Sequence, residues 1–462
     1  MDSEDKLNGE KARSEELSGK VAQLNRLAFS TIITAVLRFG IRIVKNIATT
    51  RLLGPVARGD FGLLTTIPGI VVSFGNIGFG LGSMYLIAGR KYDRKRAVAS
   101  TIVFTLLLSI LLMAVTWFVL DVGKYYKPPG NSLRIYLPFV IASVFFVMSE
   151  KTGVDLLTAT KNIGFLNSME LLYSSLPLVV LVVLWLITGD ALSSALYGWL
   201  LGTALLGIWS MAKVVQPGTS PLDVSLSYVR DALSYGARGY VSICADDVVR
   251  RIDYLFVAAI NGSQALGYYA VSVSVAEILL AMPEAVSKPF LPIRFEMEGE
   301  RGKEFSSLVV RHMLAIMLIP CTVVAIGGKL MIWILFGKAF FPAYVSMACL
   351  LPGVLALSVT NILKTDFYSL NQPGMVSKVS IYAMILNLAL NFLLIPRYGI
   401  VGAAVASSLS YDFTAVFLLV RLTRITGTRY GDFLFIKREE IAAIWRKIIK
   451  LIASSSSSSS SA

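Results

Sequence analysis

Histidine and cysteine are scarce in this chain of 462 residues, which has one His and three Cys. A single histidine, His312, excludes most histidine-based catalysis and most histidine metal sites. Cys244, Cys321 and Cys349 lie inside apolar stretches, and none has the CxxC spacing of a metal or redox motif. We therefore expect three unpaired cysteines, no bound metal and no cofactor.

Motifs for catalysis and nucleotide binding are also missing. The chain has no Walker A motif, which excludes an ATP-driven pump within it. It shows no catalytic constellation and no large polar loop that would house an enzymatic domain. We expect that the protein is not an enzyme.

Charge is the third thing in short supply. Charged residues make up 16% of the chain and hydrophobic ones 55%, whereas soluble domains carry about 25% charged residues. A membrane helix needs about 20 mainly apolar residues. Twelve stretches meet that rule: Leu27–Thr50, Phe61–Ala88, Ala97–Leu120, Ile135–Thr160, Phe165–Thr188, Ala191–Met211, Tyr240–Ile260, Leu266–Leu291, His312–Gly328, Ala343–Leu363, Val379–Ile395 and Ile400–Val420. The expected fold is an all-α, polytopic membrane protein with about twelve transmembrane helices in two six-helix halves.

These stretches divide the chain into five parts. The halves are residues 27–211 and 240–420, joined by a cytoplasmic linker at 212–239 whose segment SLSYVRDAL predicts a short amphipathic helix. Residues 1–26 are polar, lack the apolar core of a signal peptide, and are expected to form a disordered cytoplasmic tail. Residues 421–462 form a second cytoplasmic tail, with an amphipathic interfacial helix at Ile441–Ile452 and a disordered serine run.

Lysine and arginine are unevenly distributed between the two sides of the predicted membrane. The tails and even-numbered connections hold 28 of them, the odd-numbered connections 8, and the spans 7. The positive-inside rule then places both termini in the cytoplasm. The net charge of +14 is explained by this orientation and by attraction to anionic lipids, and it does not require nucleic acid.

An internal repeat relates the two halves. The stretch Ala35–Leu63 aligns with Ile243–Val271 at an offset of 208 residues, which superposes Gly54 on Gly262 and Arg42 on Arg250. Internal repeats are a recurring feature of transporters. In each stretch three ionisable residues share one helix face at i, i+4 and i+7.

Charges inside these spans are the candidate functional residues, because each one costs roughly 2.5–3.5 kcal/mol to insert and normally faces a cavity or a partner. The arginine-rich set suits an anion such as pyrophosphate, since guanidinium binds two oxygens at once. The candidate substrate-binding residues are Arg38, Arg42, Lys45, Asp246, Arg250, Arg251, Asp253, Glu277, Glu284 and Lys288.

A structural alternative stays open for part of this set. Asp246–Arg250, Asp247–Arg251 and Lys151–Asp155 are spaced i, i+4 and would neutralise each other on one helix. The first span offers three cations and no acid, so a partner for them must come from elsewhere. Pro283 and Pro289 predict a kink in the eighth span, and the glycines of the second span predict close packing or bending.

Three segments carry a family resemblance. They are LLGPVARGDFGLL at Leu52–Leu64, INGSQALGYYAVS at Ile260–Ser272, and NLALNFLLIPRYGIVGAAVASSLSY at Asn387–Tyr411. Together with twelve spans in two halves, they resemble the polysaccharide-transporter branch of the multidrug/oligosaccharidyl-lipid/polysaccharide flippase superfamily.

The resemblance implies a V-shaped pair of halves around a central cationic cavity. Arg38, Arg42, Arg250 and Arg251 match by position the cavity-facing basic residues of such flippases. The drug-exporting branch tends to place acids in the cavity, and the lipid II branch carries two further helices that Tyr430–Ile452 is too charged to supply.

The function implied is a flippase that moves lipid-linked oligosaccharide across the cell membrane by alternating access, for surface polysaccharide synthesis. Expected partners are the lipid-linked substrate, membrane lipids and a polysaccharide polymerase or glycosyltransferases, with Na⁺ or H⁺ as a candidate coupling ion. Two alternatives remain: an ion-coupled exporter of organic cations, and a non-transporting scaffold of a polysaccharide synthase.

Overall fold

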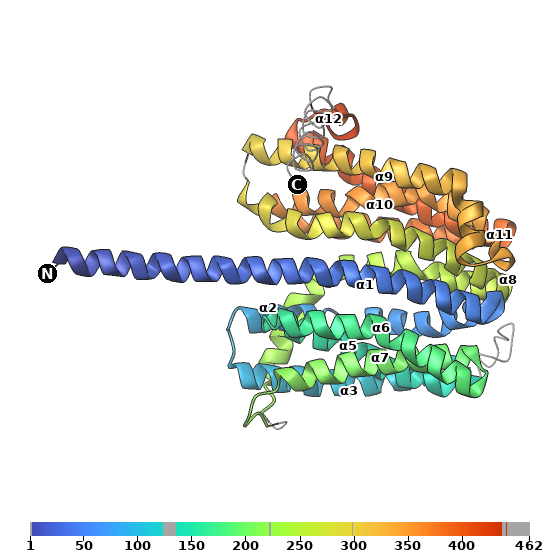
Figure 1. Ribbon diagram of the computed structural model, residues 1–462, viewed down its shortest axis with the longest axis horizontal. Helices are drawn as coiled ribbons and strands as arrows, with labels where there is room; N and C mark the ends of the chain where they lie inside the picture. The colour runs from blue at the N-terminus through green and yellow to red at the C-terminus, as the bar shows by residue number, and fades with distance from the viewer. Residues whose placement is uncertain (1, 123–134, 221–222, 298, 437–439, 441–462) are drawn as a thin grey trace, which may run out of the picture.

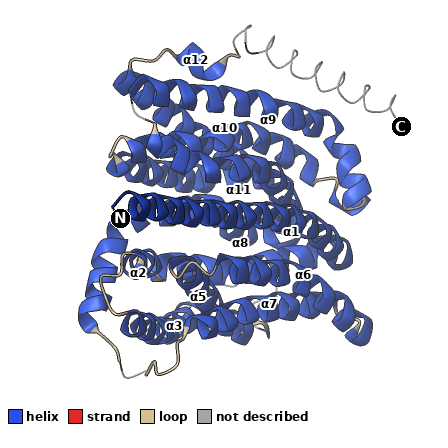
Figure 2. Cartoon of the chain, turned by 60° about the vertical axis from the view of Figure 1, so that its left-hand side comes forward, coloured by secondary structure: helices blue, strands red, loops and turns tan. Residues whose placement is uncertain are grey.

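A computed structural model describes residues 2–122, 135–220, 223–297, 299–436 and 440. Their secondary structure consists of helices, without a strand (Figure 2). The long helices are α1 (Asp2–Gly75), α3 (Arg94–Val122), α5 (Leu137–Ala159), α6 (Ile163–Thr188), α7 (Ala191–Val214), α8 (Leu226–Glu296), α9 (Gly299–Leu335), α10 (Ala343–Ser369) and α11 (Pro373–Thr426). The short ones are α2 (Phe79–Ala88), α12 (Tyr430–Leu434) and a 3₁₀ turn at Lys338–Phe340.

The helices form two groups that lie side by side. Figure 1 shows α2, α3, α5, α6 and α7 in the lower group and α9, α10 and α11 in the upper one, with α1 running between them. The start of α8, yellow-green in the figure, crosses behind the lower group toward the upper one. This arrangement confirms the expected all-α membrane fold and gives the protein a central seam between its two halves.

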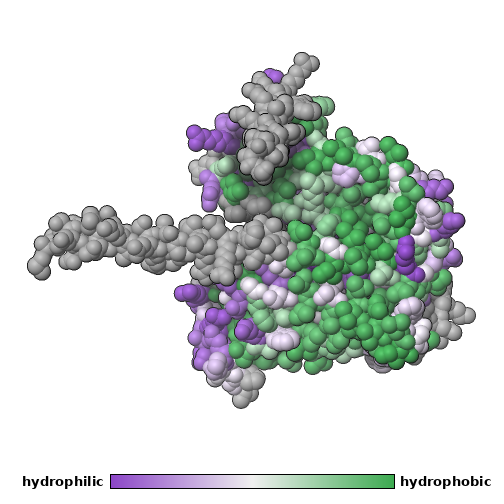
Figure 3. Space-filling view, in the orientation of Figure 1, coloured by the Kyte–Doolittle hydropathy of each residue, from purple (hydrophilic) through white to green (hydrophobic). Residues whose placement is uncertain are grey.

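Eight described helices are long and apolar enough to cross a membrane, or nine if the bent pair Val36–Gly75 and Phe79–Ala88 is one span. Large apolar side chains on these helices face outward, for example Phe118 of α3 (62% exposed) and Ile326 of α9 (80% exposed). Figure 3 shows them as a broad hydrophobic band with hydrophilic residues toward its ends. Such a band suits lipid and not water.

Three of these helices are broken in the middle by a glycine. Gly54 in α1 has φ 68° and ψ 179°, and Gly262 in α8 has φ 81° and ψ 176°. Gly399 interrupts α11 with φ 56° and ψ −134°. Side chains disfavour such positive φ values, which explains why glycine stands there. Each break separates two expected spans, so the nine long helices of the described residues account for the twelve expected spans.

The offset of 208 residues found in the sequence is matched by the backbone, because Gly54 and Gly262 have nearly the same dihedral angles. The second arms of α1 and α8, which follow these breaks, cross each other closely. A Cβ on Gly59 would lie 1.8 Å from the carbonyl oxygen of Ser263, and one on Gly267 would lie 1.8 Å from that of Pro55. Since Pro55 and Ser263 are themselves repeat partners, the crossing is nearly two-fold symmetric.

The connection between the first two spans differs from the expectation. The sequence analysis left Arg51–Asp60 outside any span, but in the structure α1 is helical on both sides of Gly54. Pro55 occupies the first position of the second arm, where its missing N–H has no intrahelical role. Arg58 therefore lies on a helix facing the interior, and not in an exposed loop.

Other boundaries also differ. Residues 2–26 continue α1 as a helix instead of being disordered; they are rich in Glu, Lys, Leu and Ala, which favour helix, and contain no Pro. The predicted linker helix is confirmed as the start of α8, where the Ser225 hydroxyl accepts a hydrogen bond from the Tyr228 N–H at 3.3 Å.

The second span bends by 60° between α1 and α2, while α8 continues as a helix through Pro283 and Pro289. The expected helix Ile441–Ile452 and the serine run lie outside the described residues.

Candidate functional site

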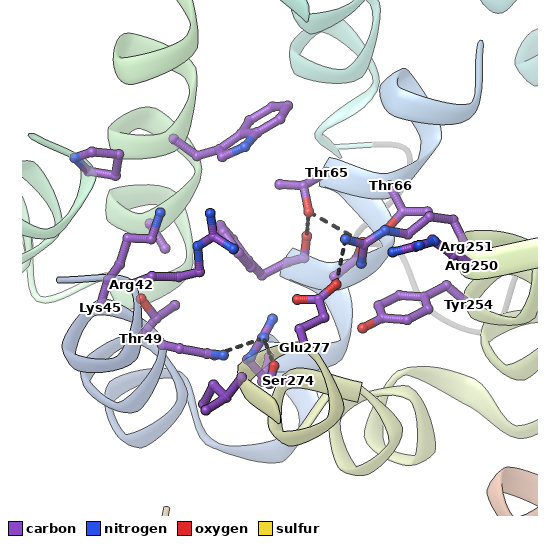
Figure 4. Close-up of a pocket in the computed structure, with 18 of the residues that line it drawn as sticks. Arg42, Lys45, Thr49, Thr65, Thr66, Arg250, Arg251, Tyr254, Ser274 and Glu277 are labelled. Carbon is purple, nitrogen blue, oxygen red and sulfur yellow. Dashed lines mark hydrogen bonds and ion pairs between the residues drawn. The ribbon is translucent and has the colours of Figure 1, made fainter. Parts of the chain in front are cut away.

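A cavity of about 470 Å³ lies at the seam between the halves. Both arms of α1 and both arms of α8 line it, and α6 and α7 contribute Tyr173, Pro177 and Trp199. A second space of about 470 Å³ continues from it and shares Thr65, Thr66, Trp199, Arg250 and Arg251. The two glycine-broken helices thus place the repeated stretches around one central space (Figure 4).

Positive charge predominates in this space. Five cationic side chains line it: Arg42, Lys45, Arg58, Arg250 and Arg251. Three acids accompany them, Glu277 and Glu284 in the first space and Asp247 in the second. Formally, the cavity therefore carries two more positive than negative charges.

Helical spacing explains how the first arm of α1 contributes. Arg42 and Lys45 are three residues apart, and Asn46 and Thr49 continue the same face into the cavity. The ammonium of Lys45 lies 5.8 Å from the centre of the Tyr173 ring, in the geometry of a cation–π contact. Arg42 and Arg250, the pair aligned by the repeat, both line the cavity (Figure 4), and neither has an acidic partner among the described residues.

Arg58 is a cavity residue that the sequence analysis did not select. Its side chain is only 8% exposed and is held by neutral oxygens: Nε donates to Thr50 Oγ1 at 3.1 Å, and Nη2 donates to Asn46 Oδ1 at 3.2 Å and to Ser274 Oγ at 3.3 Å. The described residues provide no carboxylate for it. These three bonds fix the guanidinium in place without neutralising its charge, and its Nη1 remains without a partner among the described residues.

One ion pair lies within the cavity, as far as the described residues show. Arg251 Nη2 donates to Glu277 Oε1 at 2.7 Å, across the break that separates the two arms of α8 (Figure 4). Of the five cations, Arg251 alone has such an acidic partner in the described part of the chain. Both side chains remain open to the space, with 44% and 42% of their surface exposed.

The i, i+4 pairs of the structural alternative do not form among the described residues. Asp246 pairs with Lys364 of α10 and accepts a hydrogen bond from Ser380 of α11 at 2.9 Å. Asp247 accepts one from Ser73 of α1 at 2.8 Å. Lys151 donates to the Tyr240 hydroxyl at 2.8 Å and not to Asp155. Partners on distant helices have replaced partners on the same helix, so the intrahelical alternative does not explain these charges.

Three predicted site residues lie outside the cavity. Arg38 pairs with Glu170 of α6, one turn before Arg42. Asp246 is engaged by Lys364, as described above. Asp253 is buried in the second half, where it accepts hydrogen bonds from the Tyr269 hydroxyl at 2.5 Å and the Ser407 hydroxyl at 3.1 Å. Of the two predicted helix faces, Arg42 and Lys45 from the first and Arg250 from the second reach the cavity, while Arg38, Asp246 and Asp253 turn toward neighbouring helices that the sequence could not place.

The remaining predicted residues divide in two. Arg42, Lys45, Arg250, Arg251, Glu277 and Glu284 line the cavity. The side chain of Lys288 lies outside the described part of the structure. Arg58 could have been found by treating Gly54–Pro55 as a helix break followed by a first turn, since this places it within a span.

Comparisons with known proteins relate this geometry to a family. A family model described as "Polysaccharide biosynthesis protein" matches residues 48–345, which include both repeat glycines and most of the cavity lining. The chain is also 22% identical over 406 residues to the probable low-salt glycan biosynthesis flippase Agl15 of Haloferax volcanii. That alignment covers 85% of this chain and 82% of the relative.

Two solved structures share the fold. An inward-facing multidrug resistance MATE family transporter of the MOP superfamily matches with a TM-score of 0.69 at 14% identity, over 85% of this chain and 99% of that one. The lipid II flippase MurJ, in an inward closed conformation, matches with a TM-score of 0.69 at 12% identity, over 88% of each chain. At such identities the likeness concerns the fold, and it confirms the membrane architecture expected from the sequence.

Proposed function

The chain belongs to the polysaccharide biosynthesis protein family, and from this premise we propose that it is a membrane flippase for lipid-linked oligosaccharide. Its substrate would be a polyprenyl-pyrophosphate-sugar, moved by alternating access of the central cavity. The proposed location is the cell membrane, with both termini in the cytoplasm, which agrees with the 28 to 8 distribution of Lys and Arg. The flippase relative of similar length supports this assignment.

The observation that carries the proposal is the cation surplus of the cavity. Five cations face three acids, and a pyrophosphate diester carries two negative charges, which would balance the surplus. A guanidinium binds phosphate oxygens through paired N–H groups. Trp199 lies beside these cations and offers an aromatic face to a sugar ring.

Mechanistically, Arg42, Arg58 and Arg250 would hold the pyrophosphate while the lipid tail stays in the bilayer. Both arms of α1 and α8 line the cavity, so a movement of one half against the other changes the distances between these cations. An organic cation would meet net repulsion here, which argues against the exporter alternative.

The test is flipping of a fluorescent lipid-pyrophosphate-sugar in proteoliposomes, comparing wild type with Arg42→Ala and Arg250→Ala. Hydrogen bonds to charged groups are worth about 1.5–3 kcal/mol, so each variant should flip roughly 10- to 100-fold more slowly. The matched control is the double variant Arg38→Gln/Glu170→Gln, which removes a cation from the same helix together with its partner, outside the cavity.

The control should flip at close to the wild-type rate. Equal flipping by wild type and both cavity variants would refute the role of the arginines. A wild-type protein that inserts but does not flip would refute the function itself and favour the scaffold or the cation exporter.

A further inference from the structure

The Arg251–Glu277 pair differs from the buried ion pairs elsewhere in the protein. Arg294 and Asp366, which join α8 to α10, are 6% and 1% exposed and are closed off by their surroundings. Arg251 and Glu277 are 44% and 42% exposed, and both line the cavity. An ion pair that borders an open cavity can be separated by a molecule that enters the cavity.

Glu277 lies close to a second cation. It follows Ser274 by one helical turn, and the Ser274 hydroxyl accepts the hydrogen bond from Arg58 Nη2 at 3.3 Å. Its carboxylate therefore lines the first space, on the face of α8 that also holds Arg58, and it pairs there with Arg251. That is the place where an anion bound by both arginines would have its oxygens.

A carboxylate and a phosphate offer the guanidinium fork the same chemistry, namely two oxygens that accept N–H bonds. They cannot both occupy Arg251 in the same geometry. From this we propose that Glu277 is a tethered counter-anion: it neutralises Arg251 in the empty cavity, the pyrophosphate of the substrate displaces it, and its return promotes release. This inference rests on the proposed function and adds a step to it.

Such a counter-anion solves a physical problem of the site. A cavity of fixed cations that binds a pyrophosphate tightly also releases it slowly, and a transporter must bind weakly enough to let its substrate go. An internal competitor lowers affinity and speeds dissociation at once. Glu284 serves this purpose less well, because the described residues show no cation paired with it.

The experiment measures two quantities on the full-length protein. The first is the dissociation constant for inorganic pyrophosphate, by calorimetry on the detergent-purified protein. The second is the flipping rate of the fluorescent lipid-pyrophosphate-sugar at saturating substrate in proteoliposomes. E277Q should bind pyrophosphate at least tenfold more tightly than wild type and flip several-fold more slowly.

E284Q is the matched control, since it removes the same charge from the same helix and cavity without breaking an ion pair. It should tighten binding much less than E277Q. In an Arg251→Gln background the E277Q substitution should no longer change the dissociation constant, because the competition it relieves has been removed.

The results separate this inference from the proposed function. If wild type binds pyrophosphate and flips, but E277Q binds no more tightly than wild type or E284Q, Glu277 is a structural partner or contributes only net charge, and the inference fails alone. If wild type neither binds nor flips, the proposed function fails as well. If E277Q is poorly folded by size exclusion, E277D, which shortens the tether, should still tighten binding, and its failure to do so would count against the inference.

Discussion

Arg58 illustrates how a buried charge can be positioned without being neutralised. Asn46, Thr50 and Ser274 each supply one neutral oxygen to its guanidinium. Neutral acceptors offset part of the desolvation cost and leave the net charge available to a ligand. Lys45 is held in a different way, because its ammonium lies above the Tyr173 ring as a point charge.

This difference gives a prediction for two conservative substitutions. Arg58→Lys keeps the charge but loses the planar fork that three acceptors hold, so the flipping rate should fall about tenfold or more. Lys45→Arg keeps a cation above an aromatic ring and should stay within about threefold of wild type. Initial rates at equal reconstitution measure both, and a wild-type rate for Arg58→Lys would show that its charge alone matters.

The sequence predicted most of the cavity's charged residues because a charge inside an apolar span normally faces a cavity or a partner. Helical spacing added only that Arg42 and Lys45 share one face of their helix. Arg58 was missed because the preceding turn was interpreted as a loop. The partners of Asp246 and Asp253, on α10, α8 and α11, come from tertiary packing that no local pattern encodes.

At the scale of elements, the most constrained contact is the crossing of the second arms of α1 and α8. Gly59 and Gly267 each face a carbonyl oxygen of the other arm, at a distance that leaves no space for a methyl group. Asp60 and Ser263 add a hydrogen bond of 2.5 Å at the same crossing. The two halves are therefore joined here by backbone contact.

Gly59→Ala and Gly267→Ala should each destabilise the protein by about 1–3 kcal/mol, as expected for overpacking. Their effects should not be additive, since both act on one crossing. Gly327→Ala on α9 is the control: its Cβ would meet nothing within 4 Å, and alanine is the better helix former. Thermal unfolding in detergent compares the three, and equal stability of all would mean that the arms separate easily.

The elements themselves were largely predictable from hydropathy, because a span needs a long apolar run. The positions at which these helices break were less predictable from the sequence. The glycines of the second span predicted close packing or bending. A bend is found between α1 and α2, and a Cβ on Gly82 would lie 1.9 Å from the carbonyl oxygen of Ala232 on α8. On α8 the non-helical break falls at Gly262, between the seventh and eighth expected spans, and the helix continues past Pro283 and Pro289.

At the scale of the whole molecule, the repeat organises both the fold and the site. Its two copies supply the broken helices α1 and α8, whose arms line the cavity on both sides. Similarity of sequence was sufficient to align Arg42 with Arg250, but the crossing of the two arms depends on tertiary packing that the repeat alone does not encode. A protein built this way can alternate between two related arrangements of its halves, as transporters with internal repeats do.

The cation surplus of the cavity also makes the empty protein sensitive to voltage. Moving one elementary charge through 100 mV is worth about 2.3 kcal/mol. Under the proposed function, a bound pyrophosphate would balance the two surplus charges, and translocation of the loaded cavity would carry almost no current. The empty cavity is positive, so an inside-negative potential favours its opening toward the cytoplasm and speeds the return step.

This voltage dependence can be measured in vesicles of defined protein orientation, held at opposite potentials with potassium and valinomycin. The flipping rate should differ between the two polarities, and the difference should be smaller for Arg42→Gln. Equal rates would mean that the empty cavity returns without net charge.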